Sequence, residues 1–167
     1  DNDGIMDLST SALGGEDRGV GLRLLKGNGD GTFTDVSAAS GITYNNACRA
    51  LSWGDYNNDG WPDLLQSRGF GTPVMWKNNG NGTFTNISGS IGIPASGYNT
   101  RSVGFVDVNS DGFLDFYSVP NGTAGVWMNG GNLNSWIAFR AMANGNNGMG
   151  VGARFTVWTG GMKQIRN

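Results

Sequence analysis

The sequence contains no histidine, one cysteine and one glutamate among its 167 residues. The lack of histidine excludes a Ser-His-Asp or Cys-His catalytic apparatus and any His-ligated zinc or iron site within this chain. The single thiol, Cys48, can form neither an intrachain disulfide nor a thiolate metal site. We therefore expect Cys48 to be a small buried apolar side chain, and we predict that the chain is not an enzyme.

Charge and long hydrophobic runs are also scarce. Charged residues make up 14% of the chain, the formal net charge is −2, and the 11 basic residues are scattered singly. This pattern lacks the electrostatic footprint of a protein that binds nucleic acid or an anionic membrane. No run of about 18 apolar residues could span a bilayer. Hydrophobic residues nevertheless reach 38%, which is too apolar for a disordered chain.

Glycine and asparagine are abundant, with 30 and 20 residues, so turns must be numerous. Nine of the 12 aspartates lie in three copies of one motif, Asp-x-Asn-x-Asp-Gly-x-x-Asp, spaced roughly 50 residues apart. The complete copies occupy residues 55–63 and 107–115, and the tail of another opens the chain at residues 1–7. A repeat period of this size indicates a solenoid or a propeller.

A second repeated phrase, Gly-Thr-Phe-Thr after an Asn-rich turn, follows the motif at residues 31–34 and again at 82–85. No stretch sustains helical periodicity, so helix should be nearly absent. Strand and turn signals alternate instead. In the best-preserved repeat the expected strands cover residues 50–54, 62–67, 73–77 and 83–87. Four short strands per unit predict an all-β fold made of β-propeller blades, each with four antiparallel strands.

The aspartate clustering needs a physical cause. Three carboxylates within nine residues repel one another at neutral pH, and a bound dication turns that repulsion into attraction. Oxygen ligands at motif positions 1, 3, 5, 7 (a main-chain carbonyl) and 9 can surround Ca²⁺, and glycine at position 6 allows the sharp reversal. We therefore predict calcium in the two complete loops. The predicted ligands are Asp55, Asn57, Asp59, the Trp61 carbonyl and Asp63, and Asp107, Asn109, Asp111, the Phe113 carbonyl and Asp115.

The copy at residues 1–7 offers Asp1, Asp3, the Ile5 carbonyl and Asp7, without a ligand for position 1. Magnesium fits these loops less well than calcium, because it prefers rigid octahedral sites and keeps its waters. An EF-hand requires Glu at position 12 and flanking helices, whereas position 12 is Gln66 or Ser118 here. Hairpins stabilised by Asx turns with incidental carboxylates are the structural alternative, which three copies in register disfavour.

Aromatic residues recur at repeat-equivalent or strand positions, and we expect them to form the core between blades. They are Trp53, Trp61, Trp76, Phe33, Phe84, Phe105 and Phe116. The remaining acidic residues, Glu16, Asp17, Asp30 and Asp35, do not suggest a catalytic pair, because nothing places two of them across a pocket.

The Asp motif between strands, with an aromatic residue and a glycine just before it at residues 53–54 and 104–105, resembles the FG-GAP or VCBS repeat. That repeat builds the propeller of integrin α subunits and of many secreted bacterial proteins. The resemblance covers residues 1–130. The remainder, residues 131–167, resembles the start of an ASPIC/UnbV segment, through residues 134–140 and 148–157.

The resemblance implies a secreted or cell-surface, calcium-stabilised propeller module with an adhesion, recognition or structural role and a protein or glycan ligand. A carbohydrate-binding lectin, with Trp61 or Trp76 as a sugar platform, and a non-catalytic part of a larger secreted enzyme stay open as alternatives. Glycan binding in the presence of calcium would separate a lectin from a scaffold.

Only about two and a half repeats are present, whereas closed propellers have about four to eight blades. We therefore expect this chain to be part of a larger propeller, completed by missing segments or by self-assembly. Two apolar outer faces should then meet water, lined by residues such as Phe33, Val36, Phe105 and Val106. Residues 135–159 should form strands that pack on, or extend, the preceding blade.

Overall fold

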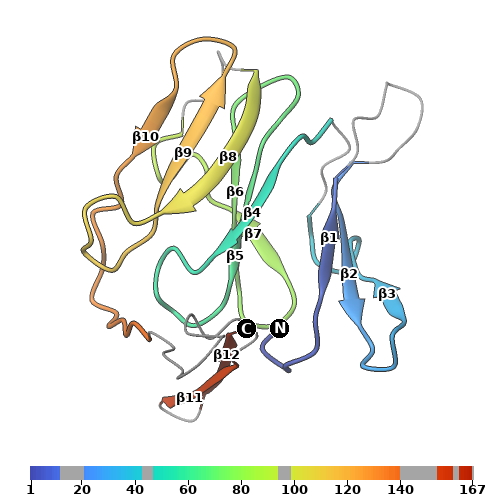
Figure 1. The fold of residues 1–167 in the computed structure, drawn as a ribbon. Coiled ribbons are helices and arrows are strands. Elements are labelled where there is room, and N and C mark those ends of the chain that lie inside the picture. The colour runs from blue at the N-terminus through green and yellow to red at the C-terminus, as the bar shows by residue number, and fades with distance from the viewer. Residues whose placement is uncertain (12–20, 43–46, 94–98, 140–153, 160–161, 167) are drawn as a thin grey trace, which may run out of the picture.

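Three antiparallel sheets follow one another along the chain and across the molecule (Figure 1). The computed structural model describes residues 1–11, 21–42, 47–93, 99–139, 154–159 and 162–166, and every regular element in these ranges is a strand. The strands are β1 (Leu8–Thr10), β2 (Arg23–Gly27), β3 (Phe33–Asp35), β4 (Leu51–Gly54), β5 (Asp63–Gln66), β6 (Val74–Asn78), β7 (Phe84–Asn86), β8 (Thr100–Val106), β9 (Asp115–Pro120), β10 (Gly125–Trp127), β11 (Phe155–Thr159) and β12 (Met162–Arg166).

We call these the first sheet (β1–β3), the middle sheet (β4–β7) and the third sheet (β8–β10); β11 and β12 form a separate hairpin. The four strands expected in the middle repeat are confirmed. β4 and β5 pair with Gly54 opposite Asp63, so the Asp motif is the turn between them. Because β1 and β9 also follow an Asp motif, the first sheet corresponds to β5–β7 and the third to β4–β6. Among the described residues, the expected four strands are complete only in the middle sheet.

The middle sheet is buried on both faces. Leu64 and Leu65 are consecutive on β5, so their side chains point to opposite faces, and both are fully buried. Leu64 belongs to a cluster shared with the first sheet, and Leu65 to a cluster shared with the third sheet. The buried members of these clusters are Leu22, Leu24, Ile42, Leu64, Val74 and Trp76 on one side, and Leu65, Met75, Ile93, Val103 and Phe116 on the other.

The aromatic core is confirmed only in part. Trp76 and Phe116 are buried, while Phe84 and Phe105 pack against the two clusters. The expectation for Phe33 is wrong, because it is 47% exposed. Phe33 lies opposite Gly27, which is three positions after the inward-facing Leu24 on β2. Alternation along the strand therefore turns Phe33 away from the middle sheet.

Two tryptophans also depart from a core position. Trp53 is 39% exposed, contrary to expectation, because it lies at the edge of the interface between the first and middle sheets. There its ring meets Phe84 edge-on at 6.0 Å, and its indole N–H donates to the Ser9 hydroxyl at 2.8 Å. Trp61 is half-buried outside both clusters, with its indole against Gly80.

The outer faces differ in detail from the expectation. Phe33 and Val106 are exposed, as expected, but Val36 and Phe105 are not on an outer face, because they pack against the interior clusters. The uncovered face of the third sheet carries Tyr117 and Val126, which are direct cross-strand partners. Alternation along each strand decides which residues face outward, and a list of apolar residues without the register cannot do so.

The C-terminal expectation is wrong in part. β11 forms, but it pairs along its length with β12 and does not extend the third sheet. Residues 135–139 contain no strand, and residues 140–153, with part of the ASPIC/UnbV-like phrase, lie outside the described residues. The Phe139 ring stacks on Phe155 at 5.4 Å, so the hairpin packs against the segment that follows the third sheet. Thr159 pairs with Met162, so β11 pairs with the strand nearest to it in the sequence and not with a distant one.

A smaller expectation is met. Cys48 is 1% exposed, and burial raises the pKa of its thiol, as expected of an inert core residue. In the part of the chain that the structure describes, no helix is long and apolar enough to cross a membrane.

Candidate functional site

The three Asp motifs adopt one backbone conformation. We call them the first loop (residues 1–7), the middle loop (55–63) and the third loop (107–115). The position 4 residues Asn2, Asn58 and Ser110 have φ of 63°, 53° and 60°, and the position 6 glycines have φ of 87°, 91° and 86°. Asparagine tolerates the left-handed region, and glycine adopts it without steric cost. The motif therefore encodes its own reversal.

Side chains at positions 1, 3 and 5 of the middle loop turn towards the backbone of the loop. Asp55 accepts hydrogen bonds from the N–H groups of Asp59 (3.0 Å) and Gly60 (2.8 Å). Asn57 Oδ1 accepts from the Asp59 N–H at 3.1 Å. Asp59 Oδ1 in turn accepts from the Trp61 N–H at 3.0 Å. These bonds place three predicted ligand side chains around one turn.

Position 9 links the loop to the rest of its sheet. Asp63 is fully buried, and its carboxylate accepts from the N–H groups of Tyr56 (3.1 Å) and Asn78 (2.8 Å). Burial raises the pKa of Asp63 to about 7, against the lowering effect of these two bonds and with a further increase from the negative charges of Asp59 and Asp55. A nearby cation would favour the ionised form of this carboxylate.

The third loop repeats this network. Asp107 accepts from the N–H groups of Asp111 (3.2 Å) and Gly112 (2.9 Å). Asp111 accepts from the Phe113 N–H at 2.9 Å. Asp115, at position 9, accepts from the N–H groups of Val108 (2.9 Å) and Asn129 (2.7 Å). In the first loop Asp3 accepts from the Ile5 N–H at 2.7 Å and Asp7 from the Gly27 N–H at 3.0 Å. The same turn therefore forms in each motif.

The donor set fits a hard cation in kind, because the predicted ligands of each loop are all oxygens gathered in one turn. Within the described ranges, no three acidic or thiol side chains are arranged as a cluster that could hold a metal ion directly. The carboxylates are directed instead at backbone N–H groups. A carboxylate oxygen that accepts one hydrogen bond keeps a second lone pair, so an ion would need a shift of side chains within the turn.

Three asparagines outside the middle loop, which were not predicted as site residues, donate hydrogen bonds to backbone carbonyls of that loop. The Asn57 carbonyl accepts from the side-chain amides of Asn132 (2.7 Å) and Asn134 (2.9 Å). The Tyr56 carbonyl accepts from the side chain of Asn129 at 2.7 Å. The only sequence signal for this role was the density of asparagine between residues 129 and 134.

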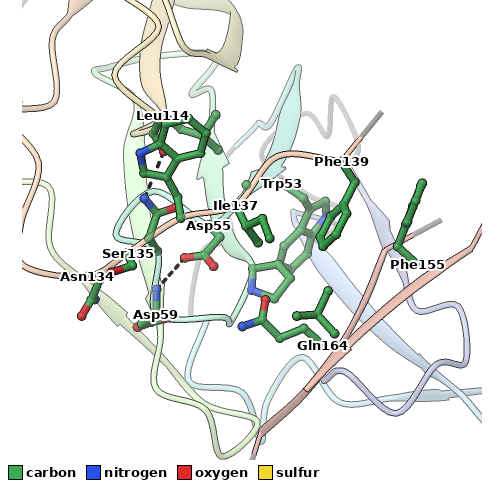
Figure 2. A pocket seen from close by; sticks show the side chains of 16 residues that line it. Trp53, Asp55, Asp59, Leu114, Asn134, Ser135, Ile137, Phe139, Phe155 and Gln164 are labelled. Atoms are coloured by element: carbon green, nitrogen blue, oxygen red, sulfur yellow. Dashed lines mark hydrogen bonds between the residues drawn. The ribbon is translucent and has the colours of Figure 1, made fainter. Parts of the chain in front are cut away.

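A cleft of about 860 Å³ opens beside the middle loop (Figure 2). Asp55 and Asp59 lie on one side, and Trp53, Phe139 and Phe155 on another. Asn134, Ser135 and Gln164 add polar groups to the wall. Trp136 also lines the cleft and is 51% exposed. Trp76, which the lectin alternative offered as a sugar platform, is buried in the core, as the core expectation had it, and does not line the cleft.

Of the acidic residues outside the motifs, Asp30 and Asp35 are described, and both accept hydrogen bonds within turns. Asp30 accepts from the N–H (2.9 Å) and hydroxyl (2.6 Å) of Thr32, and Asp35 pairs with Arg23 at 2.5 Å. Hydrogen bonds from Ser37, and then Arg23, lower the pKa of Asp35. Glu16 and Asp17 lie outside the described residues.

Face-to-face sheets in sequence order, each with an Asp-rich turn at the same end, define a repeat protein of the β-propeller type. The FG-GAP-like repeat model matches residues 1–66 and 67–118, so the chain belongs to the FG-GAP-like repeat family. The resemblance seen in the sequence is thereby confirmed for the repeats. The ASPIC/UnbV resemblance and the boundary at residue 130 stay predictions.

Cartilage acidic protein 1 of Mus musculus is 31% identical to this chain over 81 residues, which cover 48% of the chain and 12% of that protein. The matched stretch is thus a small part of the relative's length. Domains of FG-GAP repeats are generally non-catalytic and suggest an extracellular module of the adhesion or recognition type.

Proposed function

We propose that this chain is a calcium-binding propeller segment of a secreted or cell-surface protein, in which cations stiffen the Asp loops and the blades present surfaces to a protein partner. The predicted ligands are the oxygen donors of the middle and third loops named above. The family's association with adhesion and recognition supports the extracellular role. Adhesion itself would be performed by surfaces and not by chemistry on a substrate.

The repeated loop network is the observation that supports calcium most strongly. Each complete loop concentrates three carboxylates in nine residues, and Lys77, which lies 3.9 Å from Asp59, places a positive charge beside the middle loop. Exposed ion pairs of this length contribute little. A dication that prefers oxygen ligands would relieve the repulsion among the carboxylates and favour the ionised form of Asp63.

Calorimetric titration of the full chain with CaCl₂, after removal of metal with a chelator, tests this proposal. We expect at least two ions per chain, one lost in Asp59→Ala and one in Asp111→Ala, with MgCl₂ binding more weakly. Asn81→Ala is a matched control, because Asn81 caps a turn outside the Asp loops. Absence of calcium uptake by the folded, unmutated chain would refute the proposal.

A carbohydrate ligand is a second candidate, favoured by the cleft beside the middle loop. Exposed aromatic rings can stack on the apolar faces of sugar rings, and Asn134, Ser135 and Gln164 supply the kind of polar groups that bind hydroxyls. An array of immobilised neutral and acidic oligosaccharides, probed with calcium present, tests this candidate. Binding should be lost in Trp136→Ala and kept in Trp158→Ala, which changes an exposed tryptophan that does not line the cleft.

A further inference from the structure

One peptide group in each Asp loop, the unit that joins positions 6 and 7, is held from both sides. Its N–H donates to the position 5 aspartate of the same loop. Its carbonyl accepts from a side chain that lies outside that loop. Arg154 donates to the Gly4 carbonyl of the first loop at 3.2 Å. Asn2 donates to the Gly60 carbonyl of the middle loop at 2.8 Å, and Asn58 donates to the Gly112 carbonyl of the third loop at 3.0 Å.

Two of these outside donors come from the neighbouring loop. Asn2 and Asn58 occupy position 4 of their own motifs, both in the left-handed conformation. Each reaches the position 6 carbonyl of the next loop along the chain. The first, middle and third loops are therefore joined in series by equivalent hydrogen bonds that cross from sheet to sheet.

Asn58 lies between two predicted ligands of the middle loop, Asn57 and Asp59. An ion that fixes these neighbours also fixes the backbone from which the Asn58 side chain extends. On the other side, the peptide that Asn58 contacts carries the Phe113 N–H, which donates to Asp111 at 2.9 Å, and Asp111 is a predicted ligand of the third loop. The backbone at Asn58 and these two hydrogen bonds thus form a continuous path between ligand residues of the two loops.

We propose that Asn58 is a positioning residue that couples cation binding in the middle and third loops. The proposal rests on the calcium binding proposed above. Order imposed on one loop reduces the ordering that remains to be done in the other, so an ion in either loop raises the affinity of its neighbour. The coupling is reciprocal by thermodynamic linkage. A single hydrogen bond of this kind supports a coupling of about threefold to tenfold in affinity.

A thermodynamic cycle measures this coupling. All proteins carry Asp3→Ala, so that the first loop does not contribute to the titration. Asp111→Ala then isolates the middle loop, and Asp59→Ala isolates the third loop. The constant for loading both loops, divided by the product of the two isolated constants, is the coupling factor. Calorimetry with CaCl₂ supplies all three constants.

Asn58→Gly is the test variant, because glycine accepts φ of 53° without strain and removes only the amide donor. Ser110→Gly is the matched control. Ser110 has the same place in the third loop and φ of 60°, and among the described residues no hydrogen bond from its side chain to another loop is found. Both variants loosen a loop backbone equally, but only Asn58→Gly removes the bond between loops.

We expect a coupling factor of about three to ten in the parent and in Ser110→Gly, and a factor near one in Asn58→Gly. A merely structural role for Asn58 would lower the isolated affinities and leave the factor unchanged, which would overturn the inference. A factor near one in the parent, with both loops binding calcium, would also overturn it while the proposed function stands. Failure of the parent to bind calcium at all would refute both.

Discussion

The middle and third loops share a sequence motif and a hydrogen-bond network, yet their surroundings differ. In the middle loop Asn57 is 8% exposed, whereas its counterpart Asn109 is exposed. Asparagines from outside hold two carbonyls of the middle loop. The middle sheet is covered on both faces, whereas the described residues cover the third sheet on one side only. The motif therefore determines the turn, and the neighbouring segments determine how deeply the turn is buried.

This difference predicts a difference in cation affinity. A loop whose backbone is already fixed loses less conformational freedom on binding, so more of its interaction energy is available as affinity. The predicted ligands of the two loops are otherwise equivalent, because each ligand position of the motif has the same ligand type in both, as with Asp55 and Asp107 at position 1. We therefore expect the middle loop to bind calcium more tightly than the third loop, and the following variants test that comparison.

The largest effect is expected at position 9. In calcium-free protein, Asp63→Ala leaves the N–H groups of Tyr56 and Asn78 without their acceptor, at about 1–3 kcal/mol for a buried group. Asp115→Ala does the same to Val108 and Asn129. Asp63→Ala should reduce the free energy of unfolding by about 3 kcal/mol, and by more than Asp115→Ala, because both core clusters depend on the middle sheet.

Urea unfolding followed by circular dichroism, with a chelator present, measures this difference. Asp63→Asn is the conservative control, since it keeps one acceptor oxygen and should lie between the parent and Asp63→Ala. Equal destabilisation by Asp63→Ala and Asp115→Ala would show that the two sheets contribute equally to cooperative unfolding.

Chelation should have the next largest effect. A ligand that binds only the folded state adds about 2.7 kcal/mol at a hundredfold excess over its dissociation constant. Chelator should therefore lower the melting temperature of the parent. With calcium in excess, Asp59→Ala should lower it more than Asp111→Ala, because it removes the tighter site. Unchanged melting of the parent in chelator would contradict this prediction.

Much of the fold could be predicted from the sequence because it is local and repeated. The Asp motif specifies its own reversal, and alternating strand signals on either side placed β4 to β7 correctly. Side-chain environment was less predictable. Phe33 and Phe84 stand in the same repeated phrase, but only Phe84 has a sheet in front of it. Equivalent positions in a repeat therefore need not have equivalent burial.

The candidate site was predictable as a set of ligand types but not as a structure. Motif spacing brought the predicted residues of each loop into one turn, as the hydrogen bonds of Asp55 and Asp107 show. Contacts across the chain carried no such signal. Nothing in the spacing indicates that Asn132 and Asn134 reach Asn57, which is more than 70 positions away.

A glycine substitution probes the surroundings of the third loop. Gly112→Ala places a methyl group at φ of 86° and 1.9 Å from the Trp136 indole, so it strains the backbone and displaces the ring. Gly82→Ala meets the same strain at φ of 84° in open space. Gly82→Ala should cost about 1 kcal/mol and Gly112→Ala about 1 kcal/mol more. Only Gly112→Ala should shift tryptophan fluorescence; a shift in both would contradict the contact.

The smallest expected effect concerns the asparagines that hold the middle loop. The double variant Asn132→Ala, Asn134→Ala removes both donors to the Asn57 carbonyl. Each solvent-accessible bond contributes about 0.5–1.5 kcal/mol, and part of that contribution is recovered by water, so calcium affinity of the middle loop should fall by about threefold to tenfold.

Asn28→Ala is the matched control, since Asn28 bonds within a distant turn. Calorimetry in the Asp111→Ala background reads the middle loop. The third loop, read in the Asp59→Ala background, should not change. A loss of affinity in the third loop equal to that in the middle loop would show that these asparagines support the whole structure, and that burial of the middle loop does not explain its tighter binding.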